Sequence, residues 1–185
     1  RWDVLRERVS DWDPRPHLHV VDRASGLRRV LTMPGDFTLD DADWLPGGER
    51  VVYARTVPQV PRPWFRTELR VVDLATGEDR LAATFTAGWE VRPQALTPHP
   101  DGRQVLFVGP PDEIGGEREE HNVYNKQLWV LDLETGRVDR ITRGLPHAFE
   151  GARGLPAWTD DDRLLASATS GSGEVLVRLE RDGDR

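Results

Sequence analysis

Hydrophobic and polar residues alternate along this chain in short runs that recur in a fixed order. Residues 127–133 read Gln-Leu-Trp-Val-Leu-Asp-Leu, so alternate side chains fall on opposite sides of an extended backbone. This alternation of period two predicts a β-strand. The following Glu-Thr-Gly at 134–136 predicts a tight turn, because Gly accepts a positive φ without steric cost. A second strand is then expected over 137–142.

The same strand–turn–strand unit occurs three times. Each copy has an aspartate before its turn, at Asp22, Asp73 and Asp132, which gives a period of roughly 50 to 60 residues. A second unit of this kind accompanies the first, with copies at 42–54, 94–108 and 156–167. Its hairpin signals are paired glycines or Asp-Gly. Three tryptophans within these units, Trp44, Trp129 and Trp158, are expected in the core.

Together the two units make a four-stranded antiparallel sheet, and such sheets repeated at this spacing are the blades of a β-propeller. We therefore expect an all-β fold, a β-propeller of four-stranded antiparallel blades that is incomplete in this chain, with about three blades. The whole chain, 1–185, is one partial propeller domain, with blade parts expected at 1–32, 33–83, 84–142 and 143–185. Because closed propellers have about four to eight blades, the missing blades are expected from a longer polypeptide or from other copies in a homo-oligomer.

The repeat resembles a known blade type. Residues 128–136 follow the pattern Leu-x-Val-x-Asp-Leu-x-Thr-Gly, an Arg-Ile-Thr strand follows at 140–142, and a Pro-Asp-Gly-Arg turn lies at 100–103. These motifs are similar to the TolB-like propeller repeat, which also builds the N-terminal propeller of the prolyl oligopeptidase family of serine peptidases. The resemblance covers residues 16–183.

This resemblance implies a function. In that family, which includes dipeptidyl aminopeptidases and acylaminoacyl peptidases, the propeller caps an α/β-hydrolase domain and filters substrates by size. The leading interpretation is a non-catalytic, substrate-gating propeller segment of a serine peptidase that cleaves short peptides, with the catalytic α/β-hydrolase domain in the same polypeptide but outside this chain. The alternative is a TolB-like protein-interaction propeller without catalytic activity. A propeller lyase or lactonase is disfavoured, because the expected first strands begin with Leu39, Val91 and Gly154 rather than with His or acidic residues.

The composition limits which partners and which cellular location we expect. The formal net charge of −7 argues against a nucleic-acid partner. Cysteine is absent, which excludes a disulfide framework and thiol chemistry within this sequence. No apolar run is long enough to span a membrane as a helix and no signal peptide is recognisable, so a cytoplasmic location is expected.

Catalytic and metal-binding motifs are not evident in the sequence. The nucleophile elbow of α/β-hydrolases is Gly-x-Ser-x-Gly, and the nearest run, at 170–173, reads Ser-Gly-Ser-Gly and is expected to be a turn between strands. His17 and His19 lack a third ligand nearby, and the acidic runs at 40–43 and 160–162 lack the spacing of a calcium loop. We therefore expect no catalytic residue, metal or cofactor in this chain.

Long connections are the candidate functional parts, because binding residues concentrate in loops on a rigid scaffold. Loops between second and third strands are expected at 55–67 and 109–126, with residues 1–16 as the end of another, and a further long loop is expected at 143–154. In the 109–126 insertion, Arg118, Glu119 and Glu120 are candidate substrate-binding residues, and the resemblance suggests that a glutamate pair could hold a peptide amino terminus. The alternative is a solvated charged loop.

Three further residues are candidates for contact with a peptide. Trp64 and Arg66 belong to a proline-rich loop in which an aromatic pair lies between arginines, a composition found where proteins grip peptides or dock neighbouring domains. The alternative is that the aromatic pair fastens this loop to its own blade. Trp89 precedes a first strand and is a candidate for the axial channel.

Overall fold

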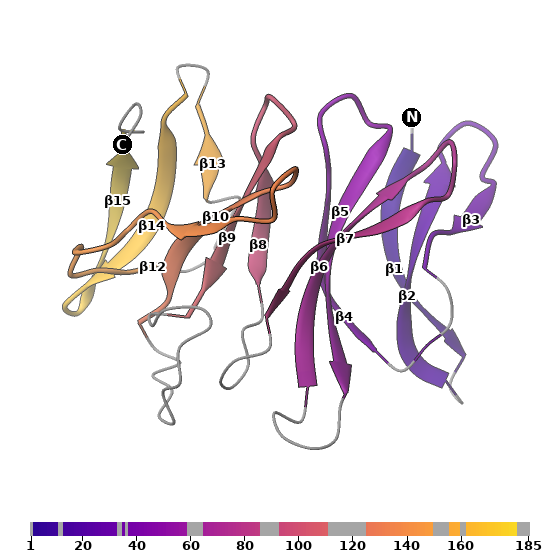
Figure 1. Ribbon diagram of the computed structural model, residues 1–185, viewed down its shortest axis with the longest axis horizontal. Helices are drawn as coiled ribbons and strands as arrows, with labels where there is room; N and C mark the ends of the chain where they lie inside the picture. The colour runs from indigo at the N-terminus through magenta and orange to yellow at the C-terminus, as the bar shows by residue number, and fades with distance from the viewer. Residues whose placement is uncertain are drawn as a thin grey trace.

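Four antiparallel sheets, placed side by side, make up the computed structural model (Figure 1). The structure describes residues 2–10, 13–32, 35, 37–58, 65–85, 93–110, 125–149, 156–159 and 162–180. The first sheet has the order β1 (Trp2–Ser10), β2 (Asp13–Asp22), β3 (Arg28–Val30). The second has the order β4 (Thr38–Trp44), β5 (Arg50–Pro58), β6 (Phe65–Asp73), β7 (Asp79–Phe85).

The third and fourth sheets continue the series. The third contains β8 (Gln94–Pro98), β9 (Gln104–Gly109), β10 (Gln127–Asp132) and β11 (Val138–Arg140) in sequential order. The fourth contains β12 (Ala148–Phe149), β13 (Ala157–Trp158), β14 (Leu164–Ser170) and β15 (Gly173–Leu179). Strand β15 pairs along the whole of β14, so β12 and β13 share the other edge of β14 as an interrupted first strand. The prediction of an all-β fold of four-stranded antiparallel blades is confirmed.

Several boundary predictions were wrong. Residues 1–16 were expected to be the end of a loop, but Trp2–Ser10 forms β1 and pairs with β2. The loop predicted at 143–154 contains β12, which pairs with β14. A strand of two residues is too short to show a periodic pattern in the sequence. Strand β12 is held by tertiary contacts instead: Phe149 is fully buried, and its backbone N–H donates to the Lys126 carbonyl (2.8 Å).

The predicted Asp-x-x-Ser/Thr-Gly turns share one geometry. In the turn after β6, Asp73 Oδ1 accepts hydrogen bonds from the backbone N–H groups of Ala75 (2.9 Å) and Thr76 (2.8 Å) and from the Thr76 hydroxyl (3.1 Å). Gly77 closes the turn at a φ of +74°. The corresponding aspartates of the other two copies, Asp22 and Asp132, make the same set of bonds. The repeat read from the sequence is therefore a repeat of hydrogen bonding.

Hydrophobic cores lie between neighbouring sheets. The largest joins the second and third sheets and includes Leu69, Phe85, Phe107 and Trp129. A second joins the first and second sheets, and a third joins the third and fourth. Trp129 is buried as predicted, whereas Trp44 and Trp158 are partly buried against the cores.

Hydrogen bonds also cross from sheet to sheet. Asp41 Oδ2, in β4, accepts from the backbone N–H of Leu96 in β8 (2.9 Å). Arg80 Nη2, in β7, donates to the carbonyl of Leu133, which follows β10 (3.0 Å). These bonds fix how the second and third sheets sit against each other, in addition to the apolar contacts.

The two ends of the strands differ. In Figure 1 the short turns after β4 and β8 lie at the top, whereas β5 ends and β6 begins at the bottom, and β9 ends and β10 begins there too. We call this lower end the loop face. The connections that leave it are short in the fourth sheet, where β14 and β15 are joined by Gly171 and Ser172, and long in the second and third sheets.

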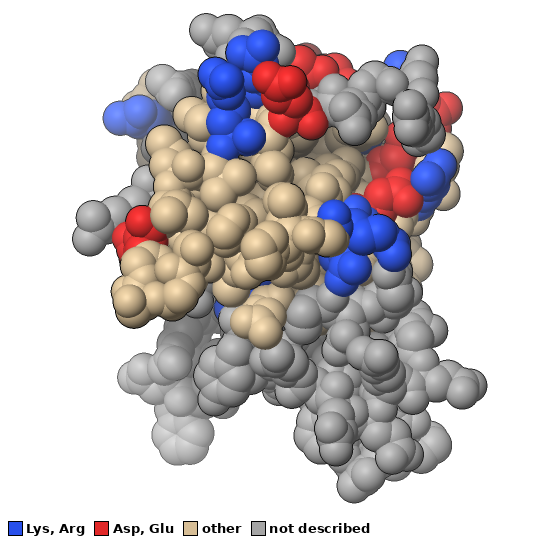
Figure 2. Space-filling model, turned by 90° about the vertical axis from the view of Figure 1, so that its left-hand side faces the viewer, with Lys and Arg blue, Asp and Glu red and all other residues tan. Residues whose placement is uncertain are grey.

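The outer side of the fourth sheet is largely uncharged. Figure 2 shows a broad area of uncharged residues with Lys, Arg, Asp and Glu toward its margins. Val175 and Leu176 of β15 are exposed. Within the described residues there is no helix, and hence none that could cross a membrane.

Candidate functional site

A network of polar and charged side chains lies on β5, β6 and the start of β7 and reaches the loop face. Alternate residues of β6, namely Arg66, Glu68 and Arg70, lie on one face of the second sheet because side chains alternate along a strand. In the antiparallel register, Arg55 of β5 is opposite Glu68, and Tyr53 is opposite Arg70. The pairing of the two strands therefore brings one carboxylate among three guanidinium groups.

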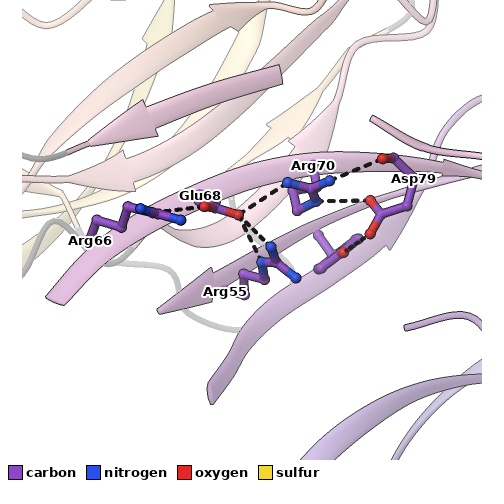
Figure 3. Close-up of polar contacts among 6 residues, drawn as sticks. Arg55, Arg66, Glu68, Arg70 and Asp79 are labelled. Carbon is purple, nitrogen blue, oxygen red and sulfur yellow. Dashed lines mark hydrogen bonds and ion pairs between the residues drawn. The ribbon is translucent and has the colours of Figure 1, made fainter. Parts of the chain in front are cut away.

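Glu68 is the centre of this network (Figure 3). Its Oε2 atom accepts from Arg55 Nε (2.8 Å), lies 2.7 Å from Arg55 Nη2, and accepts from Arg70 Nη1 (3.1 Å). Its Oε1 atom accepts from Arg66 Nε (2.9 Å). The Glu68 side chain is only 4% exposed, so these charge-assisted bonds replace its contacts with water.

The network continues toward the opposite end of the sheet. Arg70 Nε donates to Asp79 Oδ1 (2.9 Å), and Arg70 Nη2 donates to the Asp79 carbonyl (3.0 Å). The Tyr53 hydroxyl donates to Asp79 Oδ2 (2.7 Å). We call these six residues the Glu68 network: Tyr53, Arg55, Arg66, Glu68, Arg70 and Asp79. When ionised, its three arginines and two carboxylates leave one positive charge in excess.

The environment of Glu68 keeps it ionised. Burial alone would raise the pKa of Glu68, but the hydrogen bond and charge of Arg55, with the bonds from Arg66 and Arg70, outweigh burial and hold the pKa below its usual value. Burial, and then the bond to Asp79, raises the pKa of Tyr53, so this hydroxyl stays protonated. At neutral pH Glu68 is therefore negatively charged and Tyr53 is neutral.

Exposure differs among the three arginines. The Arg55 side chain is 20% exposed and lies over the Phe37 ring, with its Cζ atom 5.0 Å from the ring centroid. Arg70 is 16% exposed, whereas Arg66 is 42% exposed. Arg66 is the second residue of β6 and so lies at the loop face.

The third sheet holds the base of the 109–126 insertion. Trp129 Nε1 donates to the Pro110 carbonyl (2.9 Å), which fixes the chain as it leaves β9. Gly109 makes this approach possible, because a Cβ there would lie 2.8 Å from Trp129 Cδ1. On the other side, Lys126 Nζ donates to Gln94 Oε1 (2.8 Å), and Gln127 Nε2 donates to the His147 carbonyl (2.9 Å). Both ends of the insertion are thus tied to the sheet.

Of the six site residues predicted from the sequence, Arg66 is described and belongs to the Glu68 network. The other five lie outside the described residues: Trp64, Trp89, Arg118, Glu119 and Glu120. The loop predicted at 55–67 is shorter than expected, because β5 extends to Pro58 and β6 begins at Phe65. The sequence analysis placed Arg55 and Arg66 in this loop, whereas in the structure both lie in strands. Arg55 is paired with Glu68 across the two strands, and Arg66 contacts Glu68 along β6.

Five members of the Glu68 network were not predicted from the sequence as site residues: Tyr53, Arg55, Glu68, Arg70 and Asp79. A signal was present: Arg66, Glu68 and Arg70 occupy alternate positions of a strand that must lie inside a four-stranded sheet. Charged residues at such positions require partners, since an unpaired buried charge is costly. This reasoning would have led to Arg55 on the neighbouring strand.

Two other sequence candidates can be placed. Ser170 and Gly173 pair with each other across a hairpin turn, as predicted, so this run is not a nucleophile elbow. Across the part of the chain that the structure describes, no group of three or more His, Cys, Asp or Glu side chains could hold a metal ion.

Comparison with known proteins supports the architecture. No protein-family model matches the chain, and no curated protein matches it by sequence. Among solved structures, TolB from Acinetobacter baumannii is similar with a TM-score of 0.63 and 18% identity, over 96% of this chain and 38% of that one. An oligogalacturonate lyase from Vibrio parahaemolyticus gives a TM-score of 0.66 and 12% identity, over 95% of this chain and 44% of that one.

A peptidase domain has the same architecture. The β-propeller domain of the Trilobed protease from Pyrococcus furiosus, described as having an open velcro topology, matches with a TM-score of 0.55 and 16% identity. The match covers 99% of this chain and 51% of that propeller domain. The chain thus spans about half or less of the solved structures it resembles. At these identities the similarity establishes the propeller fold.

Proposed function

We propose that this chain is the non-catalytic, substrate-gating propeller segment of a serine peptidase that cleaves short peptides. The catalytic α/β-hydrolase domain would lie outside this chain, in the same polypeptide. The observation that carries the proposal is the match of nearly the whole chain to the propeller domain of a protease. In this role the propeller limits access by size, which is a steric effect and requires no catalytic residue.

The arrangement of the long connections supports this role. They leave the loop face from the second and third sheets, while the connection between β14 and β15 is a tight turn. The second and third sheets also share the largest core and the hydrogen bonds of Asp41 and Arg80. Substrate would meet the connections of these two sheets, whose sequences contain Trp64 in one and Glu119 and Glu120 in the other.

A TolB-like protein-interaction propeller is the second candidate. The similarity to TolB over 96% of the chain favours it. In this case the loop face would bind a folded protein partner, and no hydrolase domain would accompany the propeller.

A fluorophosphonate probe separates the two candidates. The intact protein that contains this chain would be labelled, digested and mapped, with residues 1–185 alone as the control. A labelled serine outside residues 1–185, with the control unlabelled, is the expected result. A folded intact protein that takes no label would refute the peptidase and favour the interaction propeller.

A further inference from the structure

Arg66 differs from the other two arginines of the Glu68 network. Arg55 directs both Nε and Nη2 at Glu68, and Arg70 is bound to Glu68 and Asp79 together. Arg66 contacts Glu68 through Nε (2.9 Å), and no bond of its Nη atoms to another described residue occurs. It is also the most exposed of the three, at 42%.

The geometry fixes how Arg66 can bind a ligand. A guanidinium binds a carboxylate through two parallel N–H donors. Because Nε is occupied by Glu68, the available pair is Nη1 and Nη2 at the end of the side chain. The Glu68 carboxylate thus orients the guanidinium, which reduces the side-chain entropy lost when a ligand binds.

The charge of the network fits one carboxylate. Among the described members, the three arginines exceed Glu68 and Asp79 by one positive charge, and the low pKa of Glu68 keeps this balance at neutral pH. Arg55 and Arg70 are largely buried, so the excess is accessible to a ligand at Arg66. A single carboxylate would neutralise the network, whereas a phosphate dianion would leave a negative charge beside the buried Glu68.

We propose that Arg66 is the binding site for a single carboxylate of a peptide, held end-on by Nη1 and Nη2, with Glu68 as its positioning residue. The site lies at the loop face, where the connection from β5 ends and β6 begins. The carboxylate belongs either to the peptide's carboxyl terminus or to an acidic side chain. This inference deepens the proposed function and rests on it for the choice of peptides as ligands.

The test measures binding of acetyl-Ala-Ala-Ala as the free acid and as the amide to the intact protein by calorimetry. The protein is first treated with fluorophosphonate so that no hydrolysis occurs. We expect the acid to bind roughly tenfold or more tightly than the amide, the range of a charge-assisted contact. Arg66→Gln should remove this preference, and Arg66→Lys should retain part of it.

Arg137→Gln is the matched control. Arg137 is an exposed arginine whose Nε contacts a carboxylate two residues along the chain, Asp139, at 2.8 Å, as Arg66 contacts Glu68. It precedes β11 at the turn end of the third sheet, and its replacement should leave the preference unchanged. An amidated peptide with an internal Asp identifies the source: tight binding assigns a side-chain carboxylate, and weak binding assigns the terminal one.

Equal binding of the acid, the amide and the Asp-containing amide by the unmodified sequence would overturn the inference, as would a carboxylate preference that survives Arg66→Gln in a variant with an unchanged melting temperature. This result is distinguishable from failure of the proposed function. A labelled serine without a carboxylate preference refutes the Arg66 site alone. A preference without a labelled serine keeps the site and assigns it to an interaction propeller.

Discussion

Replacing Glu68 with Gln should destabilise the protein more than any other single loss of charge in the second sheet. The substitution keeps the shape of the side chain and removes its negative charge. The Gln amide nitrogen must then face either Arg66 Nε or the donors of Arg55 and Arg70, so one set of donors loses its acceptor. The network would hold three arginines against Asp79 alone, two positive charges in excess.

The magnitude follows from the burial of Glu68. Its side chain is 4% exposed, and its arginine partners Arg55 and Arg70 are 20% and 16% exposed. Removing one partner from a buried ion pair costs about 3–5 kcal/mol. Since Gln retains one acceptor and Arg66 is partly hydrated, we expect a loss near the lower end, about 3 kcal/mol.

Urea unfolding of the intact protein at pH 7, followed by tryptophan fluorescence, measures this loss. The matched control is Glu134→Gln, the same chemical change in an exposed pair with Arg103, in which Nη2 and Oε2 are 3.9 Å apart and the side chains are 73% and 80% exposed. An exposed pair of this kind contributes about 0–1 kcal/mol. If Glu68→Gln costs no more than Glu134→Gln, the claim that the network depends on a buried charge is refuted.

The stability lost in Glu68→Gln should also depend on pH. The pKa of Glu68 is lowered from 4.5 in the folded protein, so its contribution to stability is present above 4.5 and is lost as pH falls through the folded-state pKa. The difference in unfolding free energy between the unmodified protein and Glu68→Gln should therefore shrink below pH 4.5. A difference that stays constant down to pH 3 would contradict this assignment.

Three further predictions concern the scaffold. Gly109→Ala should lower the free energy of unfolding by about 1–3 kcal/mol, because the new Cβ would lie 2.8 Å from Trp129 Cδ1. The control is Gly173→Ala, where the nearest atom would be 3.9 Å from the new Cβ. This control should be nearly neutral in the same urea titration. Thr142→Val should cost about 1–3 kcal/mol, because the buried Thr142 hydroxyl accepts from a backbone N–H of β10 at 3.1 Å, and hydrogen exchange of that amide should accelerate. Asp132→Ala should lower the urea midpoint at pH 7, with a deficit that narrows below pH 3.8, since hydrogen bonds in the turn lower the pKa of Asp132.

The parts of the fold that depend on local chemistry could be predicted from the sequence. The turns anchored by Asp22, Asp73 and Asp132 need only an aspartate, a hydroxyl and a glycine at fixed spacing, and the structure shows the same bonds in each. The alternation around Trp129 likewise identified a buried strand. Such features are set by residues close in sequence, so one sequence is enough to find them.

The parts that depend on distant residues could not be predicted in this way. Strand β12 exists because Phe149 is buried and its backbone bonds to Lys126 and β14, none of which a two-residue pattern reveals. The extension of β5 and β6 depends on the ion pairs of Glu68, which satisfy charges that would otherwise favour a loop. In both cases a tertiary contact outweighs local preference.

The position of the Glu68 network explains why it can serve binding as well as stability. A neutral buried cluster would be the better choice for stability alone, because each charge removed from water carries a desolvation cost. Here the third arginine, Arg66, lies at the exposed end of the network, where its side chain is open to a ligand. The rigid sheet behind it and the core shared with the third sheet hold that guanidinium in place, as a binding residue requires. The third sheet carries the insertion anchored by the bond from Trp129 to Pro110, so under this proposal both elements that contact a peptide stand on two sheets that share a core.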